Sequence, residues 1–170
     1  MKILIKTDKK ILDVTCGART IWFNKNHPDA IYCDRRDEEH YDIWKGDSER
    51  AFVIHPDVVC DFTSLPFEDN TFSLVVFDPP HLLNAKETAW MVKKYSKLDE
   101  TWPKMLHDGF AECMRVLKPD GVLVFKWSEH DIPADKVWKA IGRKPLFGHH
   151  SGKKSKTFWG CFMKEGDTNE

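Results

Sequence analysis

The segment "SLVVFDPPH", residues 73–81, indicates the fold class of this chain. Its apolar residues follow one another without polar alternation, which is typical of a central parallel strand that is covered on both sides. Asp78, Pro79 and Pro80 end the strand, and two consecutive prolines fix φ twice and remove two backbone donors. The result is a stiff corner. It either simply ends the strand or holds the Asp78 carboxylate and nearby carbonyl groups in place for chemistry.

Short apolar runs alternate with helical patterns on both sides of this strand. Further strands are expected at residues 11–15, 30–34, 57–62 and 122–127, with two closing strands at 144–150 and 156–164. Helices are expected at 18–26, as a short helix or turn followed by a helix, and at 85–95, 101–117 and 133–142. The charged stretch 35–50 is expected to be irregular, and "KPDG" at 118–121 is a turn signal. This alternation predicts an α/β domain with a Rossmann-like, doubly wound, mostly parallel sheet and a C-terminal antiparallel hairpin.

Length and composition favour one ordinary globular domain. The chain has 170 residues, of which 41% are hydrophobic and 31% are charged, so residues 1–165 are expected to form a single domain and 166–170 a frayed tail. The formal net charge of −1 provides no basic field over the whole protein. An anionic partner would therefore have to be bound by a local basic patch.

Cysteine usage and the N-terminus favour a cytoplasmic protein. The five cysteines are scattered without a C-x-x-C pair, which favours free thiols in a reducing compartment and predicts no metal site. The apolar run in "MKILIKTDKK" is too short for a signal peptide. No apolar run approaches the roughly 20 residues that cross a bilayer, so no membrane partner is expected.

The residues that follow each predicted strand indicate a ligand site, because open parallel sheets bind ligands beyond the carboxyl ends of their strands. Asp13 and then Cys16-Gly17 follow the first strand, Asp34 ends the second, and Asp61-Phe62 end the third. A glycine before a helix permits close backbone approach, and an acid after the second strand can bind ribose hydroxyls. Each residue also has a plain structural explanation as a turn glycine, a helix N-cap or a loop acceptor. The order of these residues along the chain favours a nucleoside-type ligand, and the absence of G-x-G-x-x-G counts against NAD.

The chain resembles class I S-adenosylmethionine-dependent methyltransferases across roughly residues 10 to 163. "ILDVTCGART" resembles the first motif of that family without its second and third glycines, and "IYCD" resembles the second motif. "DVVCDFTSLPFEDNTFSLVVFDPP" resembles the third and fourth motifs, and "RVLKPDGVLVFK" the segment that follows them. The resemblance implies S-adenosyl-L-methionine as cofactor. The cofactor-binding residues it implies are Asp13, Cys16 and Gly17 near the methionine portion, Asp34 at the ribose, Asp61 and Phe62 at the adenine, and Asp78.

Within that family, an acid or amide followed by Pro-Pro and an aromatic residue implies methylation of a planar amine. The implied catalytic residues are Asp78, Pro79, Pro80 and His81. Asp78 and the Pro79 carbonyl would accept the two N–H groups of the amine, so that its lone pair becomes available for attack on the methyl group. His81 stands where the family usually has an aromatic residue. It could stack on a base, hydrogen-bond a ring nitrogen with pH-dependent effect, or be a plain loop residue.

Lys153, Lys154 and Lys156 cluster in "GHHSGKKSK" at the tip of the predicted closing hairpin. They are expected either to contact a nucleic-acid backbone or to form a solvated loop tip. The leading hypothesis is methylation of an exocyclic amine in DNA or RNA, most plausibly adenine N6. The alternatives are a protein side chain or small-molecule amine as substrate, and an inactive cofactor-binding partner subunit. A homodimer or a separate partner chain is compatible with the sequence.

Overall fold

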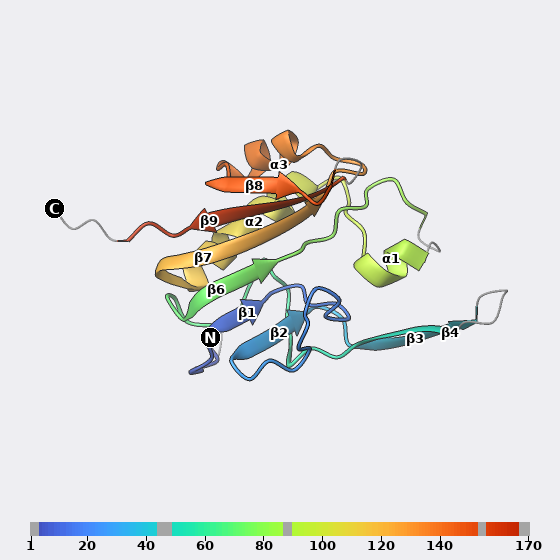
Figure 1. Ribbon diagram of the computed structural model, residues 1–170, viewed down its shortest axis with the longest axis horizontal. Coiled ribbons are helices and arrows are strands. Elements are labelled where there is room, and N and C mark those ends of the chain that lie inside the picture. The colour runs from blue at the N-terminus through green and yellow to red at the C-terminus, as the bar shows by residue number, and fades with distance from the viewer. Residues whose placement is uncertain (1–3, 44–48, 87–89, 153–155, 167–170) are drawn as a thin grey trace.

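The computed structural model describes residues 4–43, 49–86, 90–152 and 156–166. Within these ranges the chain forms a seven-stranded sheet and a separate two-stranded sheet (Figure 1). The last part of the predicted tail, residues 167–170, lies outside the described residues. No helix in the described ranges is long and apolar enough to cross a membrane.

The large sheet has the strand order β5-β2-β1-β6-β7-β9-β8. Its strands are β1 (Ile11–Asp13), β2 (Ala30–Asp34), β5 (Val58–Val59), β6 (Phe72–Phe77), β7 (Leu117–Ser128), β8 (Phe147–His150) and β9 (Thr157–Met163). The pairs from β5 to β7 are parallel, whereas β9 pairs antiparallel with both β7 and β8. This confirms the predicted Rossmann-like, mostly parallel sheet with an antiparallel C-terminal hairpin.

The order of the strands reverses at β1, which lies between β2 and β6. Asp13 at the end of β1 is in register with Tyr32 on β2 and with Val76 on β6. The chain runs outward from β1 first through β2 and β5, and then in the other direction through β6 and β7. In open parallel sheets, ligands bind beyond the strand ends at such a reversal.

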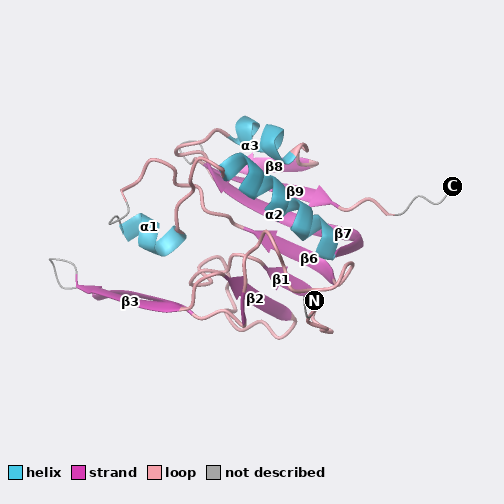
Figure 2. Cartoon of the chain, turned by 180° about the vertical axis from the view of Figure 1, so that it is seen from behind, coloured by secondary structure: helices cyan, strands magenta, loops and turns pink. Residues whose placement is uncertain are grey.

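Two of the described helices cover one face of the sheet. Figure 2 shows α2 (Trp102–Val116) and α3 (Ala134–Ile141) lying across the strands, while the short α1 (Trp90–Tyr95) lies beyond their ends. The buried positions of α2 lie at helical spacing, and Phe110 meets Phe162 of β9 with ring centroids 5.0 Å apart. Phe77, Phe125 and Trp127 belong to the same core. The core therefore lies between the sheet and these two helices.

No described helix covers the opposite face of the sheet, which faces the viewer in Figure 1. Strand alternation places Val124, Lys126, Trp159 and Cys161 on this face, opposite to the buried Phe125 and Phe162. These four side chains are partly exposed. A doubly wound sheet has helices on both faces, whereas the described helices of this chain cover one face only.

The predicted helix at 18–26 is wrong, because the segment forms consecutive turns. Arg19 has a left-handed φ of 52°, which no α-helix contains. The Arg19 guanidinium then donates to the carbonyl oxygens of Lys25 (2.7 Å) and His55 (2.8 Å), which holds the turns against the chain beyond β2.

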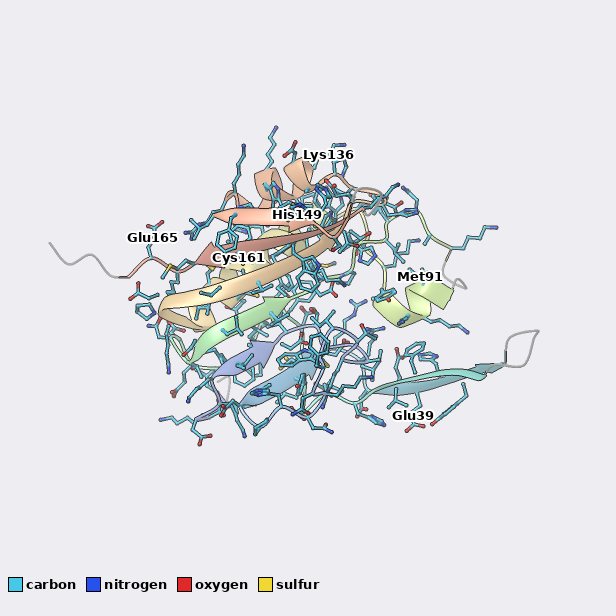
Figure 3. All side chains as sticks on the ribbon, in the orientation of Figure 1. Glu39, Met91, Lys136, His149, Cys161 and Glu165 are labelled. Carbon is cyan, nitrogen blue, oxygen red and sulfur yellow. The ribbon has the colours of Figure 1, made fainter. Side chains whose placement is uncertain are left out.

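The prediction of an irregular structure for 35–50 is also wrong where the chain is described. Residues Glu38–Ile43 (β3) and Glu49–Ile54 (β4) pair antiparallel as an arm that extends away from the large sheet (Figure 1). His40 stacks on Phe52 with centroids 4.7 Å apart, and Ile54 is buried. Glu39 lies on this arm, apart from the large sheet (Figure 3). Dense charge concealed the strand pattern, because one face of the arm is solvated.

The turn signal at 118–121 falls inside β7. Phe72 of β6 is in register with Leu117, but Leu74 is in register with Val122, so four residues of β7 oppose one residue of β6. Asp120 has a left-handed φ of 63° within this irregularity. The segment bends as a turn does while the strand continues on both sides. Elsewhere the predicted strand 57–62 is reduced to Val58–Val59.

Gly109 of α2 is expected to be essential for the packing of the core. A Cβ atom at this position would lie 2.4 Å from Cδ2 of Phe62 and 3.2 Å from Cζ of Phe77. Because both rings are buried, we expect Gly109→Ala to lower the free energy of unfolding by about 1–3 kcal/mol, measured by urea denaturation. Ala111→Leu, on the exposed side of the same helix, should change it by less than about 0.5 kcal/mol. Equal stability of the two variants would contradict this account.

Candidate functional site

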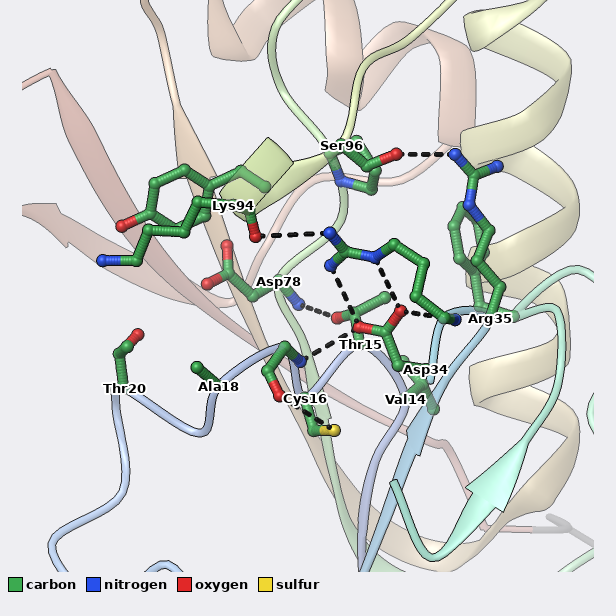
Figure 4. Close-up of a pocket in the computed structure, with 15 residues that line it drawn as sticks. Val14, Thr15, Cys16, Ala18, Thr20, Asp34, Arg35, Asp78, Lys94 and Ser96 are labelled. Atoms are coloured by element: carbon green, nitrogen blue, oxygen red, sulfur yellow. Dashed lines mark hydrogen bonds and ion pairs between the residues drawn. The ribbon is translucent and has the colours of Figure 1, made fainter. Parts of the chain in front are cut away.

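A pocket lies at the reversal point of the sheet, beyond the ends of β1, β2 and β6 (Figure 4). The chain segment at the end of α1 closes it on the other side. Its lining includes Thr15, Cys16 and Gly17 after β1, Asp34 of β2, and Asp78 after β6. The structure therefore brings residues predicted from separate strand ends into one pocket.

Asp13 lies beneath this pocket and does not line it. Its side chain is buried, with 1% of the residue exposed, and it accepts hydrogen bonds from Nε1 of Trp22 (2.7 Å) and the backbone N–H of Thr15 (3.2 Å). Burial raises the pKa of Asp13 to about 7, an effect that these two hydrogen bonds oppose. Asp13 thus fixes the loop that forms the floor of the pocket.

Gly17 and Asp34 meet across the pocket. The Gly17 backbone N–H donates to Oδ2 of Asp34 over 3.0 Å, and Gly17 has a left-handed φ of 49°. Apart from its chain neighbours, no described residue has an atom within 4 Å of the position that a Cβ would take at Gly17. Cys16 is buried beside them, and burial raises the pKa of its thiol, so the thiol stays protonated. The lack of a side chain at Gly17 therefore leaves free space next to the Asp34 carboxylate.

Arg36 holds the Asp34 carboxylate from the other side. Its Nε donates to Oδ1 over 3.0 Å and its Nη2 to Oδ2 over 3.3 Å. Nη1 donates to the carbonyl oxygen of Lys93 over 2.9 Å and to that of Lys94 over 3.4 Å, near the end of α1. Figure 4 shows the bond to Lys94. About 50 Å³ of the pocket remains free for solvent, whereas small-molecule pockets usually measure about 300–1,000 Å³. Both oxygens of Asp34 are thus engaged by Arg36, and the free space beside them is smaller than a nucleoside requires.

Asp61 and Phe62 lie differently with respect to the pocket: Phe62 lines it and Asp61 does not. Oδ1 of Asp61 accepts hydrogen bonds from the backbone N–H (2.8 Å) and hydroxyl (2.7 Å) of Thr63, which is the local loop arrangement of an acidic residue. Phe62 is buried, lines the pocket and meets Phe77 with centroids 5.2 Å apart. The apolar wall lies at the pocket, while the Asp61 carboxylate does not line it.

Asp78 lines the pocket at the end of β6. Its backbone N–H donates to Oγ1 of Thr15 (2.9 Å), and its Oδ2 accepts a hydrogen bond from Nζ of Lys126 on β7 (2.5 Å). Burial raises the pKa of Asp78, and the Lys126 charge opposes that shift. Among the described residues, no donor forms a hydrogen bond with Oδ1. The carboxylate is oriented by one oxygen and open at the other.

His81 does not lie in the pocket lining, although Pro80 does and Pro79 is buried between Asp78 and Pro80. The imidazole is buried, with 8% of the residue exposed. Its ring lies 5.7 Å from the Tyr95 ring and 6.3 Å from the Trp127 ring. Burial lowers the pKa of His81, so the imidazole is neutral at neutral pH. The aromatic residues that line the pocket are Phe62 and Tyr95.

Of the three lysines predicted to contact nucleic acid, only Lys156 belongs to the described residues. Its backbone carbonyl accepts the N–H of Glu129 over 2.8 Å, and its side chain is exposed. Lys153 and Lys154 lie outside the described residues. Glu129 also pairs with Nε2 of His150 over 2.5 Å, which introduces an acid at the base of this hairpin.

Sequence reasoning missed Thr15, Arg36 and Lys126 as residues of the site. Lys126 carries a signal in "VLVFKW": it is the only charge in an apolar strand and alternates with Phe125 and Trp127. Arg36 follows the predicted ribose-binding acid by two residues. Its contact with α1 depends on a segment far away in the chain, so no local pattern could indicate it.

No protein-family model matches the chain, and no curated protein matches it. Among solved structures, a protein of Pyrococcus horikoshii OT3 is similar with a TM-score of 0.59 and 14% identity, covering 94% of this chain and 83% of that chain. An rRNA methylase from Streptococcus thermophilus is similar with a TM-score of 0.55 and 12% identity, covering 93% and 89%. A SAM-dependent methyltransferase from Leishmania major gives 0.51 and 12%, and this chain, 92% of which is covered, spans 65% of its length. These likenesses show a Rossmann-like methyltransferase fold.

Asp13 is expected to make the stability of the protein depend on pH. A carboxyl with a pKa of about 7 when folded and about 3.9 when unfolded binds more protons in the folded state between these values. The free energy of unfolding should therefore fall by up to about 1.4 kcal/mol per pH unit as the pH rises through this window. We expect this slope to be reduced in Asp13→Asn, measured by urea denaturation from pH 4.5 to 8. Parallel curves for the two proteins would contradict it.

Proposed function

We propose that this protein is an S-adenosylmethionine-dependent methyltransferase that methylates an exocyclic amine of nucleic acid, with adenine N6 as the leading target. The observation that carries this proposal is the placement of Asp78. It stands at the reversal point of the sheet, is followed by two prolines, and lines the same pocket as Asp34. The acceptor for an amine and the acid for a ribose thus open into one space.

The residues of the pocket fit a nucleoside-type cofactor. Asp34 offers a carboxylate that can accept hydrogen bonds from ribose hydroxyls once Arg36 releases it. Phe62 provides an apolar surface for a planar ring, and Gly17 lets the ligand approach the backbone closely. Asp61 would contribute only if its side chain left the bond to Thr63. In this proposal Asp34 would bind the ribose of the cofactor, and Phe62 would contact its adenine ring.

S-adenosylmethionine, when bound, supplies an electrophilic methyl group on a sulfonium. The protein has to place a weakly nucleophilic planar amine in line with that methyl group. Asp78 accepts one N–H of the amine, which draws electron density back to the nitrogen and stabilises the positive charge that develops there. Pro79 and Pro80 hold this acceptor without loss of entropy on binding. Asp78 would also take up the proton that the amine loses on methylation and pass it to solvent.

Tyr95 offers a ring on which a planar target could stack, because it lines the same pocket as Asp78 and Pro80. His81 does not line the pocket and lies next to the Tyr95 ring, with centroids 5.7 Å apart. An aromatic stacking partner suits a nucleic-acid base better than an aliphatic amine. For this reason we place nucleic acid before a protein side chain or a small molecule as the substrate.

Labelled methyl transfer to DNA, RNA and protein extracts, followed by digestion and mass identification of the product, tests the proposal directly. We expect label in an exocyclic amine of a nucleic-acid base. Label in a protein side chain would favour the second substrate class. Cofactor binding without transfer to any of them would indicate an inactive partner subunit instead.

Asp78→Ala is expected to lower kcat by at least about 100-fold, because the amine loses its charged acceptor. Cofactor affinity, measured by calorimetry, should change by less than about threefold. Asp34→Ala should show the reverse, a weakened cofactor affinity with the acceptor intact. Asp8→Ala, at an exposed position away from the pocket, serves as the matched control. Normal turnover of Asp78→Ala would refute its assigned role.

The closing hairpin is proposed to contact the phosphate backbone through Lys153, Lys154 and Lys156. Replacing the three lysines by glutamine should weaken nucleic-acid binding and reduce the slope of log K against log salt concentration by about 0.7–0.9 per lost phosphate contact. The same replacement at Lys136 and Lys139, on the outer surface of α3, is the control. An unchanged slope in the hairpin variant would exclude this contact.

A further inference from the structure

Functional side chains form an ordered row along the carboxyl edge of the sheet. Asp34 ends β2, Asp78 follows β6, and Lys126 stands near the end of β7. Because the strand order is β2-β1-β6-β7-β9, Lys126 lies on the side of Asp78 that faces away from Asp34. If the cofactor occupies the Asp34 side, the target must approach Asp78 from the Lys126 side.

Lys126 is held from two sides, by Asp78 after β6 and by Trp159 on β9. Phe125 is in register with Phe77, so the two following residues, Lys126 and Asp78, lie side by side. Nζ of Lys126 donates to Oδ2 of Asp78, and it lies 5.8 Å from the centroid of the Trp159 ring. Trp159 is itself in register with Lys126. The ammonium is therefore held between a carboxylate and an aromatic face, where its orientation is restricted.

This arrangement offers an acceptor and a donor side by side. Oδ1 of Asp78 has no hydrogen-bond donor among the described residues, and an ammonium has three N–H groups, of which Asp78 engages one. An amine bonded to a ring carbon next to a ring nitrogen offers the complementary pair, one donor and one acceptor. Adenine, with N6 and N1, and cytosine, with N4 and N3, present this edge when unpaired.

We propose that Lys126 is a specificity-determining residue that donates a hydrogen bond to the ring nitrogen adjacent to the target amine while Asp78 accepts from the amine. This inference rests on the proposed function and names its substrate class: a base whose exocyclic amine stands next to an unprotonated ring nitrogen. Because Lys126 and Asp78 carry opposite charges, the pair adds no net charge beside the positive nitrogen that forms during methyl transfer. The pair also requires the target base to be unpaired, since both atoms belong to its Watson–Crick edge.

A structural role for Lys126 would predict a different behaviour. If the lysine only held Asp78 in place, its removal would slow methylation of every amine by the same factor. If it reads the ring nitrogen, its removal should matter only for bases that have that nitrogen. Base analogues in which the ring nitrogen is replaced by C–H separate these possibilities, because the amine itself remains.

The experiment compares oligonucleotides that carry adenine or 1-deazaadenine, and cytosine or 3-deazacytosine, at the methylated position. We expect wild-type kcat/KM to fall about 10- to 100-fold on the deaza analogue, as for the loss of a charge-assisted hydrogen bond. Lys126→Met should be slow on the natural base and lose most of this ratio, while Lys126→Arg should retain it. For each protein, kcat/KM on the natural base is divided by kcat/KM on the analogue. Dividing the wild-type value of this ratio by the variant value cancels the intrinsic effect of the analogue on the amine.

Lys118→Met, at an exposed position near the start of the same strand, should behave as wild type in both assays. If the ratio of kcat/KM on the natural base to kcat/KM on the deaza analogue is the same for wild type and Lys126→Met, the inference is overturned. The proposed function would still stand. If the wild-type protein transfers no methyl group to any nucleic-acid amine, the proposed function fails, and the inference fails with it. If Lys126→Met does not fold, a wild-type ratio near 1 still overturns the inference, because it contradicts a hydrogen bond to the ring nitrogen.

Discussion

The parallel pairing of β1 with β6 is the constraint on which the site depends. Register between Asp13 and Val76 brings the loop after β1 against the corner after β6. The hydroxyl of Thr15 then accepts the backbone N–H of Asp78, and the N–H of Thr15 is held by Asp13 below. A change of register by one residue would turn Asp78 to the other face of the sheet. The functional carboxylate is thus placed by strand pairing, and the prolines only keep it there.

The carboxylates near the pocket are each stabilised by a different partner. Burial raises the pKa of Asp13 to about 7, and no cation in the described part of the chain pairs with its carboxylate. Asp34 is held by Arg36, and Asp78 by Lys126. Two of the three negative charges are therefore balanced by neighbouring cations, and each cation lies toward a different side of the pocket. Arg36 connects its carboxylate to α1, whereas Lys126 connects its carboxylate to the antiparallel hairpin through Trp159.

Much of the fold could be predicted from the sequence, because its central strands are apolar on both faces and end in recognisable corners. Ala30–Asp34 was predicted with its observed bounds, and α2 within one residue at each end. The two largest errors have different physical causes. At 18–26 a left-handed Arg19 bonded to distant carbonyls replaces a helix, and in the arm the strand pattern is hidden by charge on a solvated face. Asp34 and Asp78 were both predicted at the ends of parallel strands, and such ends meet at one edge of the sheet, where the two acids line one pocket. The contacts of Arg36 and Lys126 depend instead on tertiary neighbours.

The burial of His81 shows how this site can differ from a motif while keeping its geometry. Two preceding prolines restrict the backbone, and the His81 side chain points into the core beside Trp127. A neutral imidazole fits such a position better than a charged one, since burial disfavours its protonated form. The ring of Tyr95, at the end of α1, lines the pocket instead, and Arg36 binds the same helix through the carbonyl oxygen of Lys93. Because Arg36 also holds the Asp34 carboxylate, one side chain connects the end of β2 with the helix that carries Tyr95.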